Sequence, residues 1–147
     1  RGFEEVQACA EAGVPVTVVP GITSAFAAPA VAGVPVSHRG VAHEIVVVSG
    51  HVAPDDPRSL TDWAALGRMT GTVVLMMAVE RAGRFAAALI THGRPADTPV
   101  VVVQDGTTRI QRTVRTTLES LEADIKAADI SPPAIIVVGP VAGLTAP

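Results

Sequence analysis

The residues best suited to binding a ligand lie at three points where an apolar run of the sequence ends. Residues 20–24 (PGITS) place a tight turn and two hydroxyls, Thr23 and Ser24, at the start of a small-residue helix, whose first amides have no partner within the helix. Residues 76–78 (MMA) and 105–107 (DGT) follow two other apolar runs. Ligands of open α/β sheets bind at strand ends, so these segments are candidates for one binding site. The alternatives are a capped helix, core methionines and an Asp-Gly turn, none of which needs a ligand.

Three charged side chains are further candidates for a ligand-binding site. Arg39 follows a turn after the small-residue helix, and we expect it to project over the same cleft. Its guanidinium could bind a carboxylate there through two parallel hydrogen bonds. Arg1 and Glu4 are one helical turn apart and could share a helix face. The alternative for all three is a solvated side chain or a surface ion pair of little energetic worth.

Several other binding and catalytic motifs are missing from the sequence. It has no glycine-rich phosphate-binding pattern of the G-x-G-x-x-G or G-x-x-x-x-G-K-[ST] type, and residues 49–51 (SGH) do not form a nucleophile elbow. His38, His43 and His51 have no cysteine nearby, so we expect no metal site.

The composition fits one domain with an aliphatic core, because 48% of the 147 residues are hydrophobic and none is tyrosine. A net charge of −3 without a Lys/Arg run argues against a nucleic-acid partner. No apolar run reaches the roughly 18 residues of a membrane helix, so we expect no membrane partner. A single cysteine cannot form an internal disulfide, which fits a cytoplasmic protein. The chain starts at Arg1, almost inside a helix, and we expect it to be part of a longer protein.

Apolar periodicity predicts alternating strands and helices. Continuous apolar runs, typical of strands covered on both faces, predict strands at residues 14–19, 44–50, 71–79, 98–106 and 132–144. Helical patterns cover residues 3–13, 23–33, 60–66, 80–93 and 116–129, the last opening with the capping-box pattern Thr116-x-x-Glu119. Residues 107–114 alternate as in an antiparallel, half-exposed ribbon. The expected fold is an α/β layered domain with a mixed, mostly parallel sheet of about five strands flanked by helices.

Together these segments resemble one known family. The stretches AGVPVTVVPGITSAFAAPAVAGVPVSHRG (residues 12–40), LITHGRPADTPVVVVQDGTT (89–108) and PPAIIVVGPV (132–141) are similar to the C-terminal half of the tetrapyrrole methylases. Within that family they look most like the uroporphyrinogen-III C-methyltransferases. The resemblance covers essentially the whole chain in order, and its most specific parts are the PGITSA and SHRG motifs and the DGTT segment.

The resemblance implies how the site is built. Family members consist of two α/β domains with a cleft that binds S-adenosylmethionine, and they work as homodimers. Carried over by position, the resemblance implies cofactor contacts at Thr23, Ser24, Met76, Met77, Ala78 and Gly106. It implies that Arg1, Glu4 and Arg39 handle the tetrapyrrole, with Arg1 or Glu4 assisting loss of a proton.

The implied activity is transfer of two methyl groups from S-adenosylmethionine to uroporphyrinogen III, which gives precorrin-2 for siroheme and cobalamin. The sequence has no match to the family's N-terminal domain with its glycine-rich loop, so we expect residues 1–147 to correspond to the C-terminal domain. Two alternatives remain open. One is another precorrin or diphthine methyltransferase, and the other is a non-catalytic module for dimerisation or ligand binding.

Overall fold

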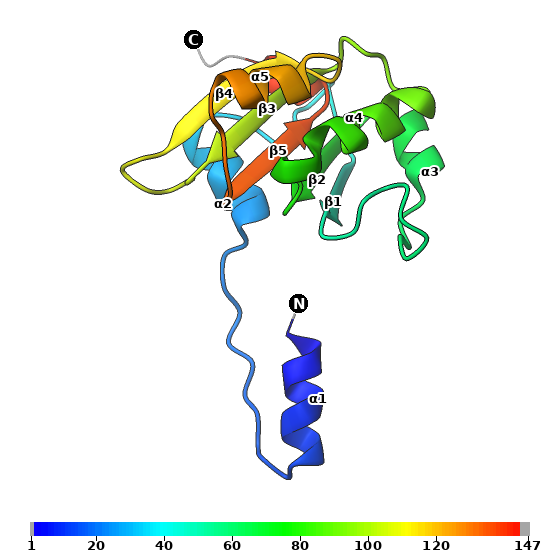
Figure 1. Cartoon of the computed structure of the whole chain (residues 1–147). Helices are drawn as coiled ribbons and strands as arrows, with labels where there is room; N and C mark the ends of the chain where they lie inside the picture. The colour runs from blue at the N-terminus through cyan, green and yellow to red at the C-terminus, as the bar shows by residue number, and fades with distance from the viewer. Residues whose placement is uncertain (1, 145–147) are drawn as a thin grey trace.

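The chain folds around one sheet with helices on both faces (Figure 1). The computed structural model describes residues 2–144, so the expected catalytic residue Arg1 lies outside the described residues. The strands are β1 (Ile45–Ser49), β2 (Thr72–Met76), β3 (Pro99–Gln104), β4 (Arg112–Thr117) and β5 (Ala134–Val138). The α-helices are α1 (Phe3–Glu11), α2 (Ser24–Val31), α3 (Trp63–Arg68), α4 (Ala82–Thr91) and α5 (Leu121–Ala127), and the two 3-10 helices are η1 (Val79–Arg81) and η2 (Pro140–Gly143). None of the described helices is long and apolar enough to span a bilayer.

The sheet has the strand order β1-β2-β5-β3-β4. Within residues 2–144, only β1 and β2 pair in parallel, whereas the pairs β2–β5, β5–β3 and β3–β4 are antiparallel. The expected mixed sheet of five strands with flanking helices is confirmed, but the expectation that it is mostly parallel is wrong. The reason is the last strand, β5. It enters between β2 and β3, which run in the same direction, and so replaces one parallel pairing with two antiparallel ones.

Each face of the sheet has its own apolar core, because successive side chains of a strand point to opposite faces. On one face α3, α4 and α5 pack on the sheet, and Phe85 of α4 clusters with Leu75 and Val102. On the other face α2 and η2 cover the sheet, and Ala28 of α2 clusters with Val101. Strands β2, β3 and β5 are buried along almost all of their length, as continuous apolar runs predict.

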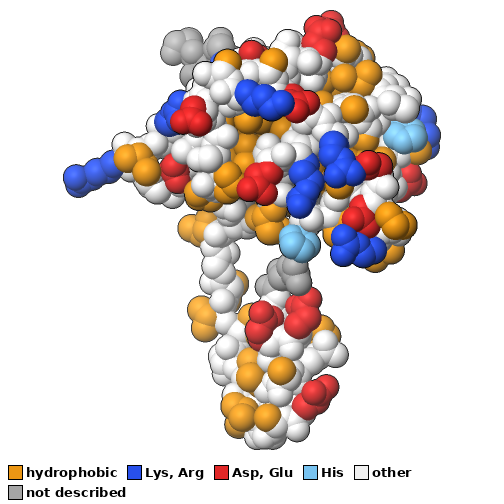
Figure 2. Space-filling view, viewed as in Figure 1, with side chains coloured by type: hydrophobic (Ala, Val, Ile, Leu, Met, Phe, Trp, Pro, Cys, Tyr) orange, Lys and Arg blue, Asp and Glu red, His pale blue; other side chains and the backbone are white. Residues whose placement is uncertain are grey.

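Residues 3–22 form an arm that stands away from the body of the protein (Figure 1). Residues 14–19, expected as a buried strand, are exposed and form no strand, and Val18 and Ile22 are 72% and 90% exposed. Figure 2 shows hydrophobic side chains in the open along this arm. The expectation is wrong for these residues because a strand needs a neighbour to pair its backbone groups, and no described strand lies beside the arm.

Helix α5 begins at Leu121 rather than at the expected residue 116. Thr116 instead belongs to β4, where it is paired with Val100 of β3, and its hydroxyl donates to Oδ2 of Asp124. The expected capping box therefore does not form. Residues 116 and 117 are part of β4 and pair with β3, so they cannot also form the first turn of a helix.

Arg94 is a buried cation that no sequence pattern singled out. It is 3% exposed and follows α4, and its guanidinium donates to the carbonyls of Gly71 at 3.0 Å, Leu66 at 3.2 Å and Met69. These carbonyls belong to the end of α3 and to the loop before β2. Arg94 thus ties the end of α4 to the segment that leads into β2.

Candidate functional site

A cavity of about 730 Å³ lies at the edge of the sheet where β2 and β3 end and β5 begins. Its lining combines apolar side chains with a few polar ones: Ser24, Ala28, His51, Met76, Met77, Val79, Glu80, Arg81, Val103, Asp105, Gly106, Thr108, Pro132, Pro133, Ala134 and Ile135. The fold thus brings the three candidate segments to one place. Ser24, Met76, Met77 and Gly106 line the cavity although they lie far apart in the sequence.

The two hydroxyls at the start of α2 have different positions. The Oγ1 atom of Thr23 accepts a hydrogen bond from the amide of Ala25 at 3.3 Å, so Thr23 is the helix N-cap and does not line the cavity. Ser24, the first residue of the helix, is exposed and lines the cavity. Thr23 thus caps the helix, and its expected cofactor contact stays a prediction, whereas Ser24 is the hydroxyl that lines the cavity.

Met77 follows β2 in an unusual backbone conformation. Its φ is 54°, in the left-handed region that non-glycine residues rarely adopt, and its side chain is 52% exposed in the cavity wall. Ala78, the next residue, is only 1% exposed and does not line the cavity. It packs so closely on Gly50 that a Cβ added to Gly50 would lie 2.6 Å from the Cβ of Ala78. A ligand could reach Ala78 through its backbone alone.

Gly106 lies in the turn after β3, and its lack of a side chain has a packing reason. A Cβ at this position would lie 2.5 Å from the Cβ of Ala28 in α2. The flanking residues Asp105 and Thr107 have φ values of 49° and 72°. The turn is thus pressed against α2 in a tightly constrained conformation, which brings Gly106 beside Ser24 in the cavity lining.

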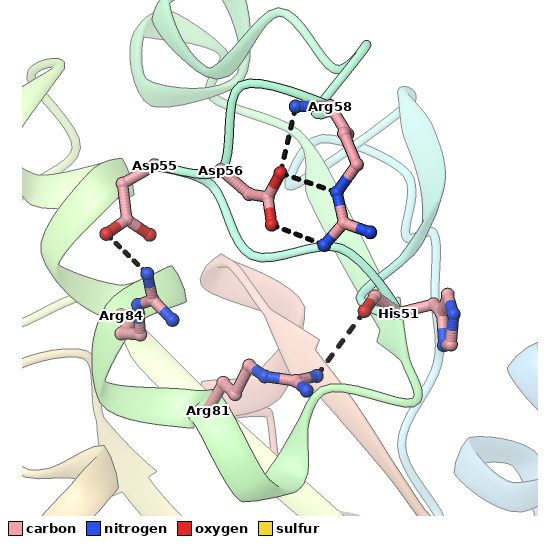
Figure 3. Close-up of polar contacts among 6 residues, drawn as sticks. All are labelled: His51, Asp55, Asp56, Arg58, Arg81 and Arg84. Atoms are coloured by element: carbon pink, nitrogen blue, oxygen red, sulfur yellow. Dashed lines mark hydrogen bonds and ion pairs between the residues drawn. The ribbon is translucent and has the colours of Figure 1, made fainter.

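The polar residues of the cavity that sequence reasoning missed include Glu80 and Arg81 of η1. They are separated from the MMA segment by Val79 alone, and this proximity in sequence was the one signal that could have found them. Nη1 of Arg81 donates to the carbonyl of His51 at 3.4 Å (Figure 3). Pro132 and Pro133 join the cavity because β5 starts at this edge, which follows from the strand order alone.

Two arginines near Arg81 are already paired with carboxylates (Figure 3). Arg58 binds Asp56 through two parallel hydrogen bonds of 2.9 and 2.7 Å, and these hold the pKa of Asp56 well below its usual value. Arg84 binds Asp55, and this hydrogen bond lowers the pKa of that carboxyl. Both carboxylates therefore stay ionised at neutral pH. Among the described residues, Arg81 has no carboxylate within ion-pair distance.

The charged residues expected over the cleft lie elsewhere. Arg39 is exposed in the short turn closed by His38 and Ala42, next to residues 40–44 and 70–71, which line a different cavity. That cavity is at the start of β2, and the candidate site is at its end, so the expectation that Arg39 projects over the same cleft is wrong. The cause is that α2 carries the chain back across the sheet before β1 begins. Glu4 is on the arm and does not line the cavity.

No group of three His, Cys, Asp or Glu side chains in residues 2–144 is arranged to hold a metal ion. The charged residues of the cavity lining are Glu80, Arg81 and Asp105, and His51 also lines the cavity. A zwitterionic organic ligand could interact with both signs of charge here.

Comparison with known proteins decides the family. A sequence profile of the Tetrapyrrole (Corrin/Porphyrin) Methylases matches residues 1–122, which is most of the chain. The chain belongs to the tetrapyrrole methylases. The resemblance inferred from residues 12–40 and 89–108 is thereby confirmed.

Two relatives show how much of a longer protein this tetrapyrrole methylase chain covers. Siroheme synthase 1 of Klebsiella pneumoniae is 45% identical over 144 residues, which are 98% of this chain and 30% of that protein. The S-adenosyl-L-methionine-dependent uroporphyrinogen III methyltransferase of Methanosarcina barkeri is 40% identical over 98% of this chain and 56% of its own length. The chain thus spans about a third to a half of these relatives.

Solved structures confirm the fold of the tetrapyrrole methylase chain. Uroporphyrin-III C-methyltransferase from Thermus thermophilus, complexed with S-adenosylhomocysteine, is 34% identical with a TM-score of 0.81 over 99% of this chain and 62% of that one. A cobalt precorrin-4 methyltransferase is 25% identical with a TM-score of 0.85 over 96% of this chain and 59% of that one.

Proposed function

We propose that the chain is part of an S-adenosylmethionine-dependent uroporphyrinogen-III C-methyltransferase that makes precorrin-2 for siroheme or cobalamin. The observation that carries this proposal is the meeting of Ser24, Met77 and Gly106 in one cavity. The family resemblance had assigned these three residues to the cofactor before their positions were known. The proposal is supported by the relatives that methylate uroporphyrinogen III and by the neighbour that binds S-adenosylhomocysteine.

The residues of the cavity fit S-adenosylmethionine. The apolar wall of Met76, Met77 and Ile135 suits the adenosine and the methylene groups, and a polarizable thioether tolerates a neighbouring sulfonium. The carboxylates of Glu80 and Asp105 can balance the positive charge of the cofactor. When bound, the cofactor supplies an activated methyl group. The task of the protein is to align a pyrrole carbon with that methyl group and to keep water out.

We propose that a preceding N-terminal domain of the same protein completes the cleft, and that the working form is a cytoplasmic homodimer. The exposed arm supports the first point, because Val18 and Ile22 lie in the open and residues 14–19 have no partner strand. The lengths of the relatives support it as well. The roles of Arg1, Glu4 and Arg39 in handling the tetrapyrrole stay predictions for the complete enzyme.

The proposed function is tested with the complete enzyme, S-adenosylmethionine and uroporphyrinogen III under anaerobic conditions. Mass spectrometry should find a tetrapyrrole that carries two added methyl groups, together with S-adenosylhomocysteine. Methylation of a different precorrin, or of a diphthine precursor, would favour another member of the family. Cofactor binding without methyl transfer to any of these substrates would favour a non-catalytic module. The likeness to diphthine synthase, at 18% identity, shows the fold alone.

Removal of the Met77 side chain should weaken cofactor binding without lowering the stability of the protein. In the complete enzyme we expect Met77→Ala and Met77→Gly each to weaken S-adenosylhomocysteine binding about tenfold, because an apolar contact is lost. Met77→Gly should not lower the free energy of unfolding, since glycine adopts a φ of 54° without strain. Calorimetric titration and urea unfolding measure the two quantities. Met69→Ala is the control, because Met69 lies outside the cavity, and equal affinity losses at both positions would count against this site.

Arg81 should act on the acidic tetrapyrrole. It borders both the candidate cavity and a neighbouring one, whose other cations, Arg84 and Lys126, are already paired with carboxylates. Among the described residues Arg81 has no such partner, so its guanidinium is available to a carboxylate of a large ligand. We expect Arg81→Ala to weaken tetrapyrrole binding about ten- to a hundredfold and to spare S-adenosylhomocysteine binding. Arg58→Ala, which removes an arginine already paired with Asp56, should change neither affinity.

The same pair of titrations, one with each ligand, decides the predicted role of Arg39. A loss of tetrapyrrole affinity in Arg39→Ala would support that role despite its distant position. If Arg81→Ala lowers cofactor affinity and leaves tetrapyrrole affinity intact, Arg81 binds the cofactor instead.

A further inference from the structure

Gln104 is the last residue of β3 and lies directly before the turn that carries Gly106, yet its side chain does not line the cavity. It is one of the few buried polar residues of the chain, 9% exposed. Side chains alternate along a strand, so Gln104 points to the opposite face from Val103, towards the segment that follows α5. A polar side chain buried at this point needs partners for both ends of its amide.

Both ends of the Gln104 amide have such a partner. The Oε1 atom accepts from the backbone amide of Ser131 at 3.1 Å, and Nε2 donates to Oδ2 of Asp105 at 2.9 Å. The orientation of the amide is fixed by chemistry, because a backbone N–H can only donate and an ionised carboxylate can only accept. Gln104 therefore bridges two segments that are distant in the sequence.

These two segments are neighbours in the cavity wall, because Gln104 of β3 is paired with Ala134 of β5. Asp105 and Gly106 follow β3, Pro132 and Pro133 precede β5, and all four residues line the cavity. The amide of Asp105 also donates to the carbonyl of Pro133 at 3.0 Å, which closes a small hydrogen-bonded ring around the Gln104 bridge. Asp105 has a φ of 49°, a conformation that its surroundings must maintain.

We infer that Gln104 is a positioning residue, which clamps the Asp105–Gly106 turn to the Ser131–Pro133 segment and thereby holds the cavity in its ligand-binding shape. The clamp also orients the carboxylate of Asp105, because Nε2 of Gln104 occupies one of its oxygens. The identity of the ligand, S-adenosylmethionine or S-adenosylhomocysteine, rests on the proposed function. The clamp itself rests on the two hydrogen bonds and on the burial of Gln104.

The test is a double-mutant cycle in the complete enzyme, made of Gln104→Glu, Asp105→Asn and the double variant. Gln104→Glu keeps the acceptor for Ser131 but places a second carboxylate against Asp105. The double variant exchanges the two groups, so that the amide of Asn at position 105 can donate to the new carboxylate. S-adenosylhomocysteine affinity is measured by calorimetry, and the free energy of unfolding is measured in parallel for every variant.

We expect Gln104→Glu to bind S-adenosylhomocysteine about tenfold more weakly at about pH 8. Two adjacent carboxylates raise the pKa of one of them, so the ratio of the Gln104→Glu affinity to the wild-type affinity should rise towards one as the pH falls to about 5. The double variant should lose less binding free energy than the two single variants lose together. Gln104→Met, which removes both hydrogen bonds, should show the loss without the pH dependence.

Several results would overturn the clamp. One is an affinity ratio for Gln104→Glu that stays at one over the whole pH range. Another is a coupling between positions 104 and 105 that is present in the free energy of unfolding but absent from S-adenosylhomocysteine affinity. That result would indicate a purely structural role for Gln104. If the wild type fails to bind S-adenosylhomocysteine, the proposed function is refuted separately. The clamp is then decided by hydrogen exchange: the amide of Ser131 should exchange faster in Gln104→Met, and unchanged exchange refutes the clamp.

Discussion

Residues 1–147 alone should bind S-adenosylhomocysteine at least about a hundredfold more weakly than the complete enzyme, a difference of about 2.7 kcal/mol. The cavity is formed by the ends of β2 and β3, the start of β5 and the start of α2. In the relatives this segment is about a third to a half of the protein, so much of what we propose to enclose the ligand is outside it. A ligand in a half-open cleft keeps more of its contacts with water and gains less from burial.

Calorimetric titration of both proteins with S-adenosylhomocysteine measures this difference. Met77→Ala in the isolated chain is the control. If the residual binding uses the cavity described here, this change should weaken it about tenfold further. Equal affinities for the isolated chain and the complete enzyme would contradict the prediction, and would show that the cavity needs no further wall.

Replacement of Arg94 by methionine should lower the free energy of unfolding by about 1.5–3 kcal/mol. The guanidinium is 3% exposed and holds the carbonyls of Gly71, Leu66 and Met69. Methionine fills a similar volume but donates no hydrogen bond, so these carbonyls lose their Arg94 donors inside the protein. The loss should loosen α3 and the segment that leads into β2.

Urea unfolding followed by the fluorescence of Trp63 measures this effect. Trp63 is the single tryptophan of the chain, it begins α3, and its ring lies 5.4 Å from that of Phe85 of α4. The matched control is Arg68→Met, an exposed arginine in the last turn of α3, which should cost no more than about 1 kcal/mol. Similar losses for Arg68 and Arg94 would mean that the buried hydrogen bonds contribute little.

The sequence by itself determined the family and most of the local elements. Continuous apolar runs identified β2, β3 and β5, because a strand covered on both faces has no need of polar residues. The turn at residues 20–24 and the glycine at position 106 belong to motifs specific enough to carry a family resemblance. That resemblance assigned Ser24, Met77 and Gly106 to one site before any contact between them was known.

Tertiary structure decided which strands pair and which partners the buried polar groups have, because both depend on segments that are distant in the sequence. The position of β5 between β2 and β3 made the sheet mostly antiparallel, and no apolar run encodes which strand will be its partner. Residues 14–19 have the composition of a strand, but backbone hydrogen bonds need a second chain segment, and the described residues supply none beside them. The carbonyls around Arg94 and the bridge made by Gln104 likewise come from segments distant in sequence, because a buried polar side chain takes its partners from wherever the fold brings them.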